Sequence, residues 1–299
     1  MRRALSVPCF ADDPADLVDL GTGAERAGLD GYFLWDHLVH ADSGEGPPVV
    51  DPWQVLAVVA ARTSRIKLGT MITPVARRRP WKLAKEATTL DLLSAGRVIL
   101  GVGLGAPSSE FSLFGEPTGA RHRAELLDEG LDVLAGLCTG QSFSHAGKHF
   151  TVGPVTFSPG PVQRPRIPIW VGGVFPSGGP LAQAARKVAG KQPVRGPVAR
   201  AARWDGFVPI HPGRPGHRPA VGDIAAVRDR IAGLRGSAEG FDIAVWGELD
   251  AAGQVAALLP GYHAAGATWW LESPGSGPGW LDAVRDRLRR GTEVKSPRG

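Results

Sequence analysis

Residues 51–110 have the sequence DPWQVLAVVAARTSRIKLGTMITPVARRRPWKLAKEATTLDLLSAGRVILGVGLGAPSSE. This segment predicts a helix capped by Asp51, a strand over Ile66–Ile72, a second helix that begins at Pro80, and a buried strand over Val98–Val102 that opens into a glycine-rich loop. Helices that alternate with strands in this way are crossovers between parallel strands. Ligands bind at the carboxyl ends of such strands, so the glycine loop marks a candidate site.

The same alternation extends along the chain and predicts an α/β fold, a TIM (β/α)8 barrel, as a single domain over residues 1–290. Two segments exceed a minimal barrel, an insertion after the fourth helix with a small hairpin (140–168) and one after the fifth strand (174–197), and a disordered tail is expected at 291–299. The expected strands are 5–8, 31–35, 66–72, 98–102, 167–171, 206–209, 242–246 and 268–271, and the expected helices are 14–27, 52–63, 81–94, 121–138, 180–202, 222–234, 252–265 and 279–290.

Composition narrows the functional class. The 299 residues are 43% hydrophobic, as in a globular protein, and no apolar run approaches the ~20 residues of a membrane helix. The amino terminus predicts a first strand and not a signal peptide, and Cys9 and Cys138 suit free thiols in a reducing cytoplasm. The net charge of +5 comes from scattered basic residues, so we expect no nucleic-acid partner, and the basic residues either form a solvated surface or meet an anionic small ligand.

Six short motifs resemble one family in their order along the chain. They are Trp35-Asp36-His37-Leu38, Asp51-Pro52, residues 63–70 (TSRIKLGT), residues 83–97 (LAKEATTLDLLSAGR), residues 100–111 (LGVGLGAPSSEF) and residues 168–173 (PIWVGG). Together the motifs resemble the bacterial luciferase-like flavin and deazaflavin oxidoreductase superfamily. The resemblance implies a TIM barrel, a cofactor at the carboxyl ends of the strands, and a homodimer. The motif WDHL is more similar to the deazaflavin branch, which uses coenzyme F420, than to the luciferase branch, which uses FMN.

Asp36 and His37 are the predicted catalytic residues, because they leave the second strand at the end where a barrel holds its active site. An imidazole there can form a hydrogen bond to the edge of a flavin ring or move a proton near neutral pH. Asp36 can fix the tautomer of that imidazole or simply accept a backbone hydrogen bond. The alternative is a surface loop pair. His37 and His40 have the spacing of a metal pair, but no third ligand accompanies them, and we predict no metal site.

The predicted cofactor-binding residues also follow strand ends. The resemblance implies that Thr70, Met71 and Ile72 form a bulge behind the cofactor ring, against the alternative of an ordinary strand end with Met71 in the core. The glycine loop can approach a ligand closely through Gly103, Leu104 and Gly105. The resemblance further implies that Gly172 and Gly173 hold the cofactor phosphate.

Rim positions after the later strands make His211, Trp246 and Glu272 candidates for a substrate pocket. Some deazaflavin relatives have an acid directly after the last glycine of the loop as a proton donor, and this chain has Ala106 there, which argues against a sugar-phosphate dehydrogenase. Glu110 remains nearby and is expected to be a helix or loop residue and not that proton donor.

The resulting hypothesis is an F420-dependent oxidoreductase that transfers a hydride to or from a small organic substrate. The first alternative is a luciferase-like monooxygenase that uses reduced FMN delivered by a partner reductase. An alternative of another class is a non-catalytic paralogue that binds the cofactor.

Overall fold

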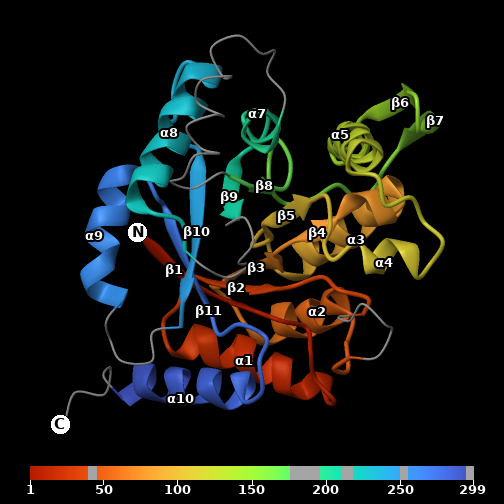
Figure 1. Cartoon of the computed structure of the whole chain (residues 1–299). Coiled ribbons are helices and arrows are strands. Elements are labelled where there is room, and N and C mark those ends of the chain that lie inside the picture. Colours follow the sequence, from red (N-terminus) through yellow and green to blue (C-terminus); the bar gives the residue numbers. More distant parts are fainter. Residues whose placement is uncertain (40–45, 176–195, 211–217, 250–254, 294–299) are drawn as a thin grey trace. The chain divides into compact units, whose positions relative to one another are not determined.

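The computed structural model describes residues 1–39, 46–175, 196–210, 218–249 and 255–293 (Figure 1). These residues form two compact units. Unit 1 comprises Met1–Val7, Gly23–Tyr32 and Ile169–Gly299, and unit 2 comprises Pro8–Thr22 and Phe33–Pro168. Helix α1 (Pro14–Arg26) and strand β2 (Gly31–Leu34) contribute residues to both units. The expectation of a single domain stays a prediction.

Unit 1 contains a parallel sheet whose strands follow the order β2, β1, β11, β10, β9, β8. Its register pairs Leu5 with Glu272, Trp246 with Leu271, and Val171 with Phe207. Helices α8, α9 and α10 lie along the outer side of these strands (Figure 1). The bounds are β1 (Arg2–Val7), β8 (Ile169–Val174), α7 (Pro197–Ala201), β9 (Gly206–Ile210), α8 (Val221–Arg235), β10 (Asp242–Glu248), α9 (Val255–Ala265), β11 (Trp269–Ser273) and α10 (Trp280–Glu293).

Unit 2 continues the alternation with strands β3 and β5, as the opening segment predicts. Asp51 caps α2 by accepting hydrogen bonds from the backbone N–H groups of Trp53 (2.8 Å) and Gln54 (3.1 Å), and Pro52 begins that helix. Three short elements were not predicted, namely strand β4, the 3-10 helix η1 and helix α4. The bounds are α2 (Pro52–Arg62), β3 (Lys67–Thr70), β4 (Thr73–Pro74), the 3-10 helix η1 (Val75–Arg77), α3 (Pro80–Leu93), β5 (Leu100–Gly103), α4 (Ser109–Ser112) and α5 (Ala120–Leu137).

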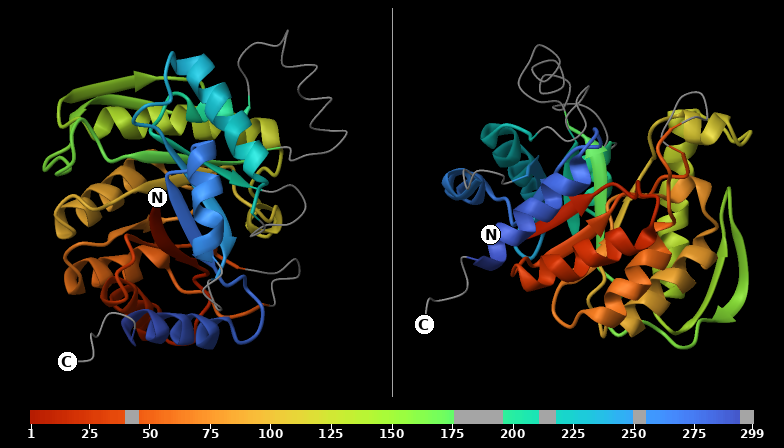
Figure 2. Two further views of the ribbon diagram at one scale, coloured as in Figure 1. Left: turned by 90° about the vertical axis from the view of Figure 1, so that its left-hand side faces the viewer. Right: turned by 90° about the horizontal axis from the view of Figure 1, so that it is seen from below.

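The segment after α5 forms the predicted hairpin. Strands β6 (Ser142–Ala146) and β7 (Thr151–Thr156) pair antiparallel, and both views of Figure 2 place them beside α5. Glu129 on α5 attaches the hairpin loop, because its carboxylate accepts the backbone N–H groups of His149 (2.9 Å) and Phe150 (2.7 Å).

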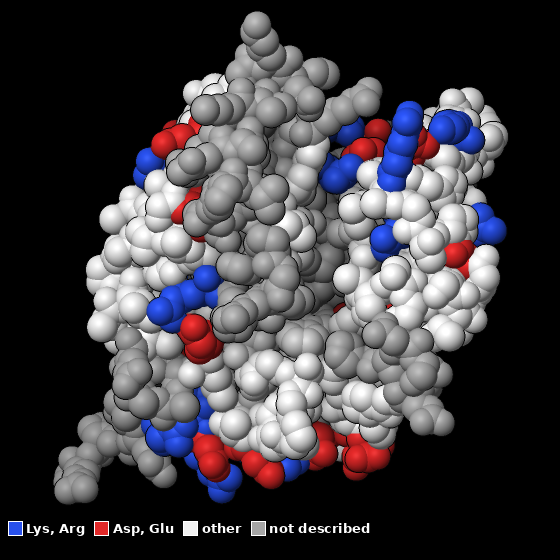
Figure 3. Space-filling model, in the orientation of Figure 1, with Lys and Arg blue, Asp and Glu red and all other residues white. Residues whose placement is uncertain are grey.

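All eight predicted strands are present with ends shifted by a few residues. The helix expected at 180–202 lies largely outside the described residues, which include its end as α7. The insertion expected at 174–197 also lies outside them, apart from two residues at each end. Helix α10 extends to Glu293, so residues 291–293 of the expected tail are helical. No described helix has the length and apolar character needed to cross a bilayer. Basic and acidic side chains are interspersed on the face drawn in Figure 3.

Candidate functional site

The carboxyl ends of three strands of unit 2 lie together. The backbone N–H of Met71 donates to the carbonyl of Leu34 (2.7 Å), which joins the segment after β3 to β2. Thr73 of β4 pairs with Val102 of β5. His37, the segment 70–73 and the loop after Gly103 therefore leave neighbouring strands at one edge, the edge where a parallel α/β fold binds ligands.

The His37 imidazole lies within hydrogen-bond distance of a carboxylate, a contact that the sequence did not predict. His37 Nδ1 lies 3.1 Å from Oε1 of Glu110, which is fully buried on the short helix α4. The same oxygen accepts the backbone N–H groups of Leu38 (2.7 Å) and Val39 (3.1 Å), and Arg77 Nη1 donates to the other oxygen. Glu110 lies in a helix, as expected, but nothing in the sequence indicated its contact with His37.

Burial alone would raise the pKa of Glu110, but the hydrogen bond from His37 and the positive charges of Arg77 and His37 hold that pKa below its usual range. The carboxylate is thus ionised at neutral pH and acts only as an acceptor. Nδ1 of His37 must then bear a hydrogen, which leaves Nε2 as the ring nitrogen that can exchange a proton.

Asp36 does not fix the tautomer of His37, because its carboxylate accepts hydrogen bonds from other side chains, among them Arg77, which also binds Glu110. The Asp36 carboxylate accepts from Arg78 Nη2 through both oxygens (3.0 and 2.9 Å), from Arg77 Nη2 (3.1 Å), from the Thr73 hydroxyl (2.7 Å) and from the Trp53 indole (3.3 Å). The Asp36 and Arg77 side chains are 1% and 3% exposed. Asp36 therefore holds together the buried residues beneath the site, and Glu110 is the residue that orients the His37 imidazole.

The bulge between β3 and β4 packs against β5 with almost no spare room. The peptide bond between Met71 and Ile72 is cis, and Met71 is 1% exposed. A Cβ on Gly101 would lie 2.4 Å from the Thr70 carbonyl oxygen and 2.8 Å from Met71 Sδ. Gly101 is thus a glycine because the bulge occupies its side-chain space.

The loop after β5 is also shaped by protein atoms. Gly105 has φ +86°, and a Cβ there would lie 2.8 Å from the Phe111 ring and from Pro74. Arg123 of α5 supports the loop, since its Nη1 donates to the carbonyls of Gly105 (2.8 Å) and Leu104 (3.3 Å). The glycine at 105 therefore has a packing reason that is independent of any ligand.

Several predicted residues belong to unit 1. Gly172 and Gly173 are in β8, and a Cβ on Gly173 would lie 2.2 Å from Pro197, so α7 packs there. Trp246 is 9% exposed, and its indole donates to the Ser6 hydroxyl (3.2 Å). His211 lies outside the described residues.

The structure contradicts the prediction that Glu272 lines a substrate pocket. Its carboxylate is fully buried and accepts from Arg287 of α10 (2.9 and 3.0 Å) and from Arg3 of β1 (2.6 Å). It therefore joins β1, β11 and α10 on the helix side of the sheet, and it does not line a substrate pocket at the strand ends.

Apolar and aromatic groups remain partly uncovered around His37. Leu38 is 47% exposed, although Asp36 two residues earlier is buried. The rings of Trp35 and His37 lie 6.1 Å apart between centroids, and among the described residues the buried Trp35 Nε1 meets no acceptor. Ile72 and Leu104 are half-buried at positions where their strand neighbours are buried. An uncovered apolar surface beside an indole donor and an oriented imidazole suits a flat ring with polar edges.

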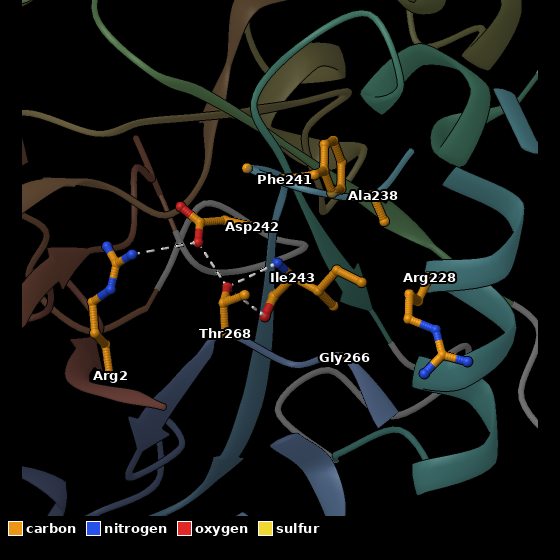
Figure 4. Close-up of a pocket in the computed structure, with 9 residues that line it drawn as sticks. Arg2, Arg228, Ala238, Phe241, Asp242, Ile243, Gly266 and Thr268 are labelled. Carbon is orange, nitrogen blue, oxygen red and sulfur yellow. Dashed lines mark hydrogen bonds and ion pairs between the residues drawn. The ribbon is translucent and has the colours of Figure 1, made fainter. Parts of the chain in front are cut away.

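Unit 1 has a cavity of about 320 Å³ at the opposite, amino-terminal ends of its strands. Arg2, Asp242 and Thr268 stand at or just before the first residues of β1, β10 and β11, and Figure 4 shows Arg2 and Thr268 directed at Asp242 while Arg228 extends from α8. Thr268 donates to Asp242 at 2.7 Å, and burial raises the pKa of Asp242. Amino-terminal ends of barrel strands generally serve stability, so the active site belongs at the other end.

Known proteins resemble the chain in sequence and in fold. The sequence model of the luciferase-like monooxygenase family matches residues 3–204, which include His37, Glu110 and the bulge. The chain belongs to the luciferase-like monooxygenase family. A family relative, the F420-dependent glucose-6-phosphate dehydrogenase of Microbacterium testaceum, is 34% identical over 188 residues, which are 60% of this chain and 54% of the relative. The chain thus spans about half the length of the curated relatives it matches.

Solved structures of similar fold include the F420-dependent tetrahydromethanopterin reductase of Methanopyrus kandleri, with a TM-score of 0.70 and 17% identity over 98% of both chains. A monooxygenase from Streptomyces bottropensis matches with a TM-score of 0.61 and 20% identity, over 98% of this chain and 89% of that one. The predicted fold class, a TIM barrel, is confirmed.

Proposed function

We propose that the chain is an F420-dependent oxidoreductase that transfers a hydride between the deazaflavin and a small organic alcohol or carbonyl compound. The observation that supports this most is the His37 imidazole held by ionised Glu110 beside an uncovered apolar surface at the strand ends. The name of the relative from Microbacterium testaceum supports the choice of F420.

The residues of unit 2 fit a tricyclic ring. Met71 and Ile72 form the bulge behind it, and Leu38 and Leu104 offer apolar contact. The buried Trp35 Nε1–H, which has no acceptor among the described residues, is a donor for a ring carbonyl. When bound, F420 supplies hydride transfer, chemistry that no side chain offers.

The chain's own residues handle the proton. During oxidation of an alcohol, Nε2 of His37 takes the hydroxyl proton as the C–H hydride leaves, and the imidazolium that forms is stabilised by Glu110 through Nδ1. During reduction of a carbonyl the same nitrogen returns the proton. Arg77 and Asp36 keep Glu110 and the His37 segment in place and take no part in proton transfer.

Ala106 separates this proposal from the activity named for the relatives. The position after Gly105 holds an exposed alanine, and Glu110, four residues later, is ionised and already accepts four donors. Neither residue can act as the proton-donating acid that some deazaflavin relatives have directly after this glycine, so we favour a substrate other than a sugar phosphate.

Binding of F420 and FMN, each followed by fluorescence on the purified chain, tests the cofactor. Tighter F420 binding together with F420 reduction in the presence of an alcohol panel supports the proposal. Preference for FMN would favour a monooxygenase, the activity in the family name, with reduced FMN supplied by a partner reductase. Binding of either cofactor without turnover on any substrate would favour a non-catalytic paralogue.

The catalytic part of the proposal is tested by His37→Ala. We expect turnover to fall by about 10²-fold or more, because a positioned acid–base group contributes at least that much. His263→Ala on α9, an exposed histidine of unit 1, is the control and should leave turnover unchanged.

A further inference from the structure

Three metal-ligand side chains outside the active site converge where α5 meets the β6–β7 loop. The ligand atoms of His122, Glu125 and His149 all lie within 4.8 Å of one another. His149 Nε2 is 3.3 Å from Glu125 Oε2, and the His122 and His149 rings have centroids 5.2 Å apart. We propose that these three residues bind a divalent transition metal ion of the zinc type.

The geometry is prepared by the fold. His122 and Glu125 are three residues apart on α5, so they face the same side of the helix. His149 is held over that face because Glu129, one turn further along, accepts the His149 backbone N–H through both oxygens (3.0 and 2.9 Å). The third ligand is therefore positioned before any ion arrives, which lowers the entropic cost of binding.

The donor set selects the class of ion. Two imidazoles and one carboxylate are the ligands of open zinc sites, which complete their tetrahedron with water. Calcium and magnesium prefer oxygen ligands alone, so they are poor occupants. The His149 and Glu125 side chains are 11% and 31% exposed, which leaves the pair partly desolvated and still reachable. The bound ion would fasten the hairpin loop to α5 and stabilise the folded chain.

Two basic side chains compete with the ion for Glu125. Lys148 Nζ lies 2.7 Å from Oε2 and Arg121 Nε lies 3.3 Å from Oε1. Their side chains are 71% and 90% exposed, so each can move into solvent at small cost. Removal of the Lys148 charge should therefore strengthen metal binding, an effect opposite to that of removing a ligand.

The experiment uses the full chain without a histidine tag, stripped with EDTA and titrated with zinc chloride by calorimetry. We expect one zinc per chain and an affinity at least about 100-fold lower in His122→Ala and His149→Ala, since even outer partners of a metal site cost 10–100-fold. Lys148→Met should bind about 2- to 5-fold more tightly, the value of an exposed ion pair. His263→Ala, far along the sequence on α9, should bind as the parent chain does.

Circular dichroism of each variant shows whether the fold survives. If His149→Ala fails to fold, Glu125→Gln provides the ligand deletion from a half-exposed position, with the same expected loss. Zinc uptake that His122→Ala and Glu125→Gln leave unchanged would overturn the proposal, as would the lack of stoichiometric uptake by the parent chain.

Discussion

Glu110→Gln tests the link between Glu110 and His37 with a minimal change of shape. Three donors converge on Oε1, from His37, Leu38 and Val39, so the new amide nitrogen must take the Oε2 position. There it faces the Arg77 guanidinium, and two donors oppose each other inside a buried network. Loss of one charged hydrogen bond and its replacement by a repulsive contact should cost about 3 kcal/mol of unfolding free energy.

The catalytic effect is separable from the stability effect. His37 keeps an acceptor in the variant but loses the negative charge that stabilises its imidazolium form. A hydrogen bond to a charged acceptor contributes roughly 1.5–3 kcal/mol, which corresponds to about 10- to 100-fold in kcat. The assay is steady-state F420 reduction with alcohol substrate, with chemical denaturation run on the same sample.

Glu129→Gln is the matched control. Its carboxylate also accepts a histidine ring nitrogen, from His145 (3.2 Å), and two backbone N–H groups, but it lies at the hairpin. We expect it to lower stability and leave kcat unchanged. Equal losses of kcat in both variants, or full activity in Glu110→Gln, would refute the assignment.

Four further outcomes follow from the same contacts. Because the pKa of Glu110 is depressed, its stabilising contribution is present above the usual glutamate range and is lost as the pH falls through the lower, folded-state pKa; acid titration of unfolding free energy should show this loss in the parent and not in Glu110→Gln. Asp36→Asn should lower the unfolding free energy by about 3–5 kcal/mol in urea denaturation, since Arg78 loses its buried partner, and an unchanged midpoint would contradict the network. Gly101→Ala should cost about 1–3 kcal/mol by overpacking, whereas Gly119→Ala, with open space at its Cβ, should shift the melting temperature little. Burial raises the pKa of Cys9 to about 12, so a thiol reagent at pH 8 should label it only after denaturation, and rapid labelling of the native chain would contradict its burial.

Sequence patterns were sufficient for the strands because each is a short run of apolar residues bounded by glycine or polar turns. The helix cap at Asp51 and the start at Pro80 were equally local, and both are present as predicted. The placement of His37 at a strand end needed only the order of elements, because parallel strands put their carboxyl ends on one edge.

Contacts distant in sequence could not be predicted in the same way. Glu110 meets His37 across 73 residues, and its helix of four residues has no periodic pattern. The basic residues were expected to form a solvated surface or to meet an anionic ligand, yet Arg77 is 3% exposed because it pairs with two buried acids. A glycine such as Gly101 signals a close approach, but the sequence does not say whether protein or ligand makes that approach.

The side of the sheet on which Glu272 lies could have been predicted from the sequence. Side chains alternate along a strand, so Glu272 shares a face with Trp270, whose ring packs on Tyr262 of α9 (5.3 Å). That periodicity directs the Glu272 carboxylate toward the helices, although the residue lies near the end of its strand.

The most direct measurement is a crystal structure of the chain with F420 bound. The proposal requires the deazaflavin ring to lie against the Met71–Ile72 bulge, with a polar ring edge within hydrogen-bond distance of His37 Nε2 or Trp35 Nε1. A ring found instead in the amino-terminal cavity beside Arg2 and Asp242, or no F420 density at saturating concentration, would contradict it.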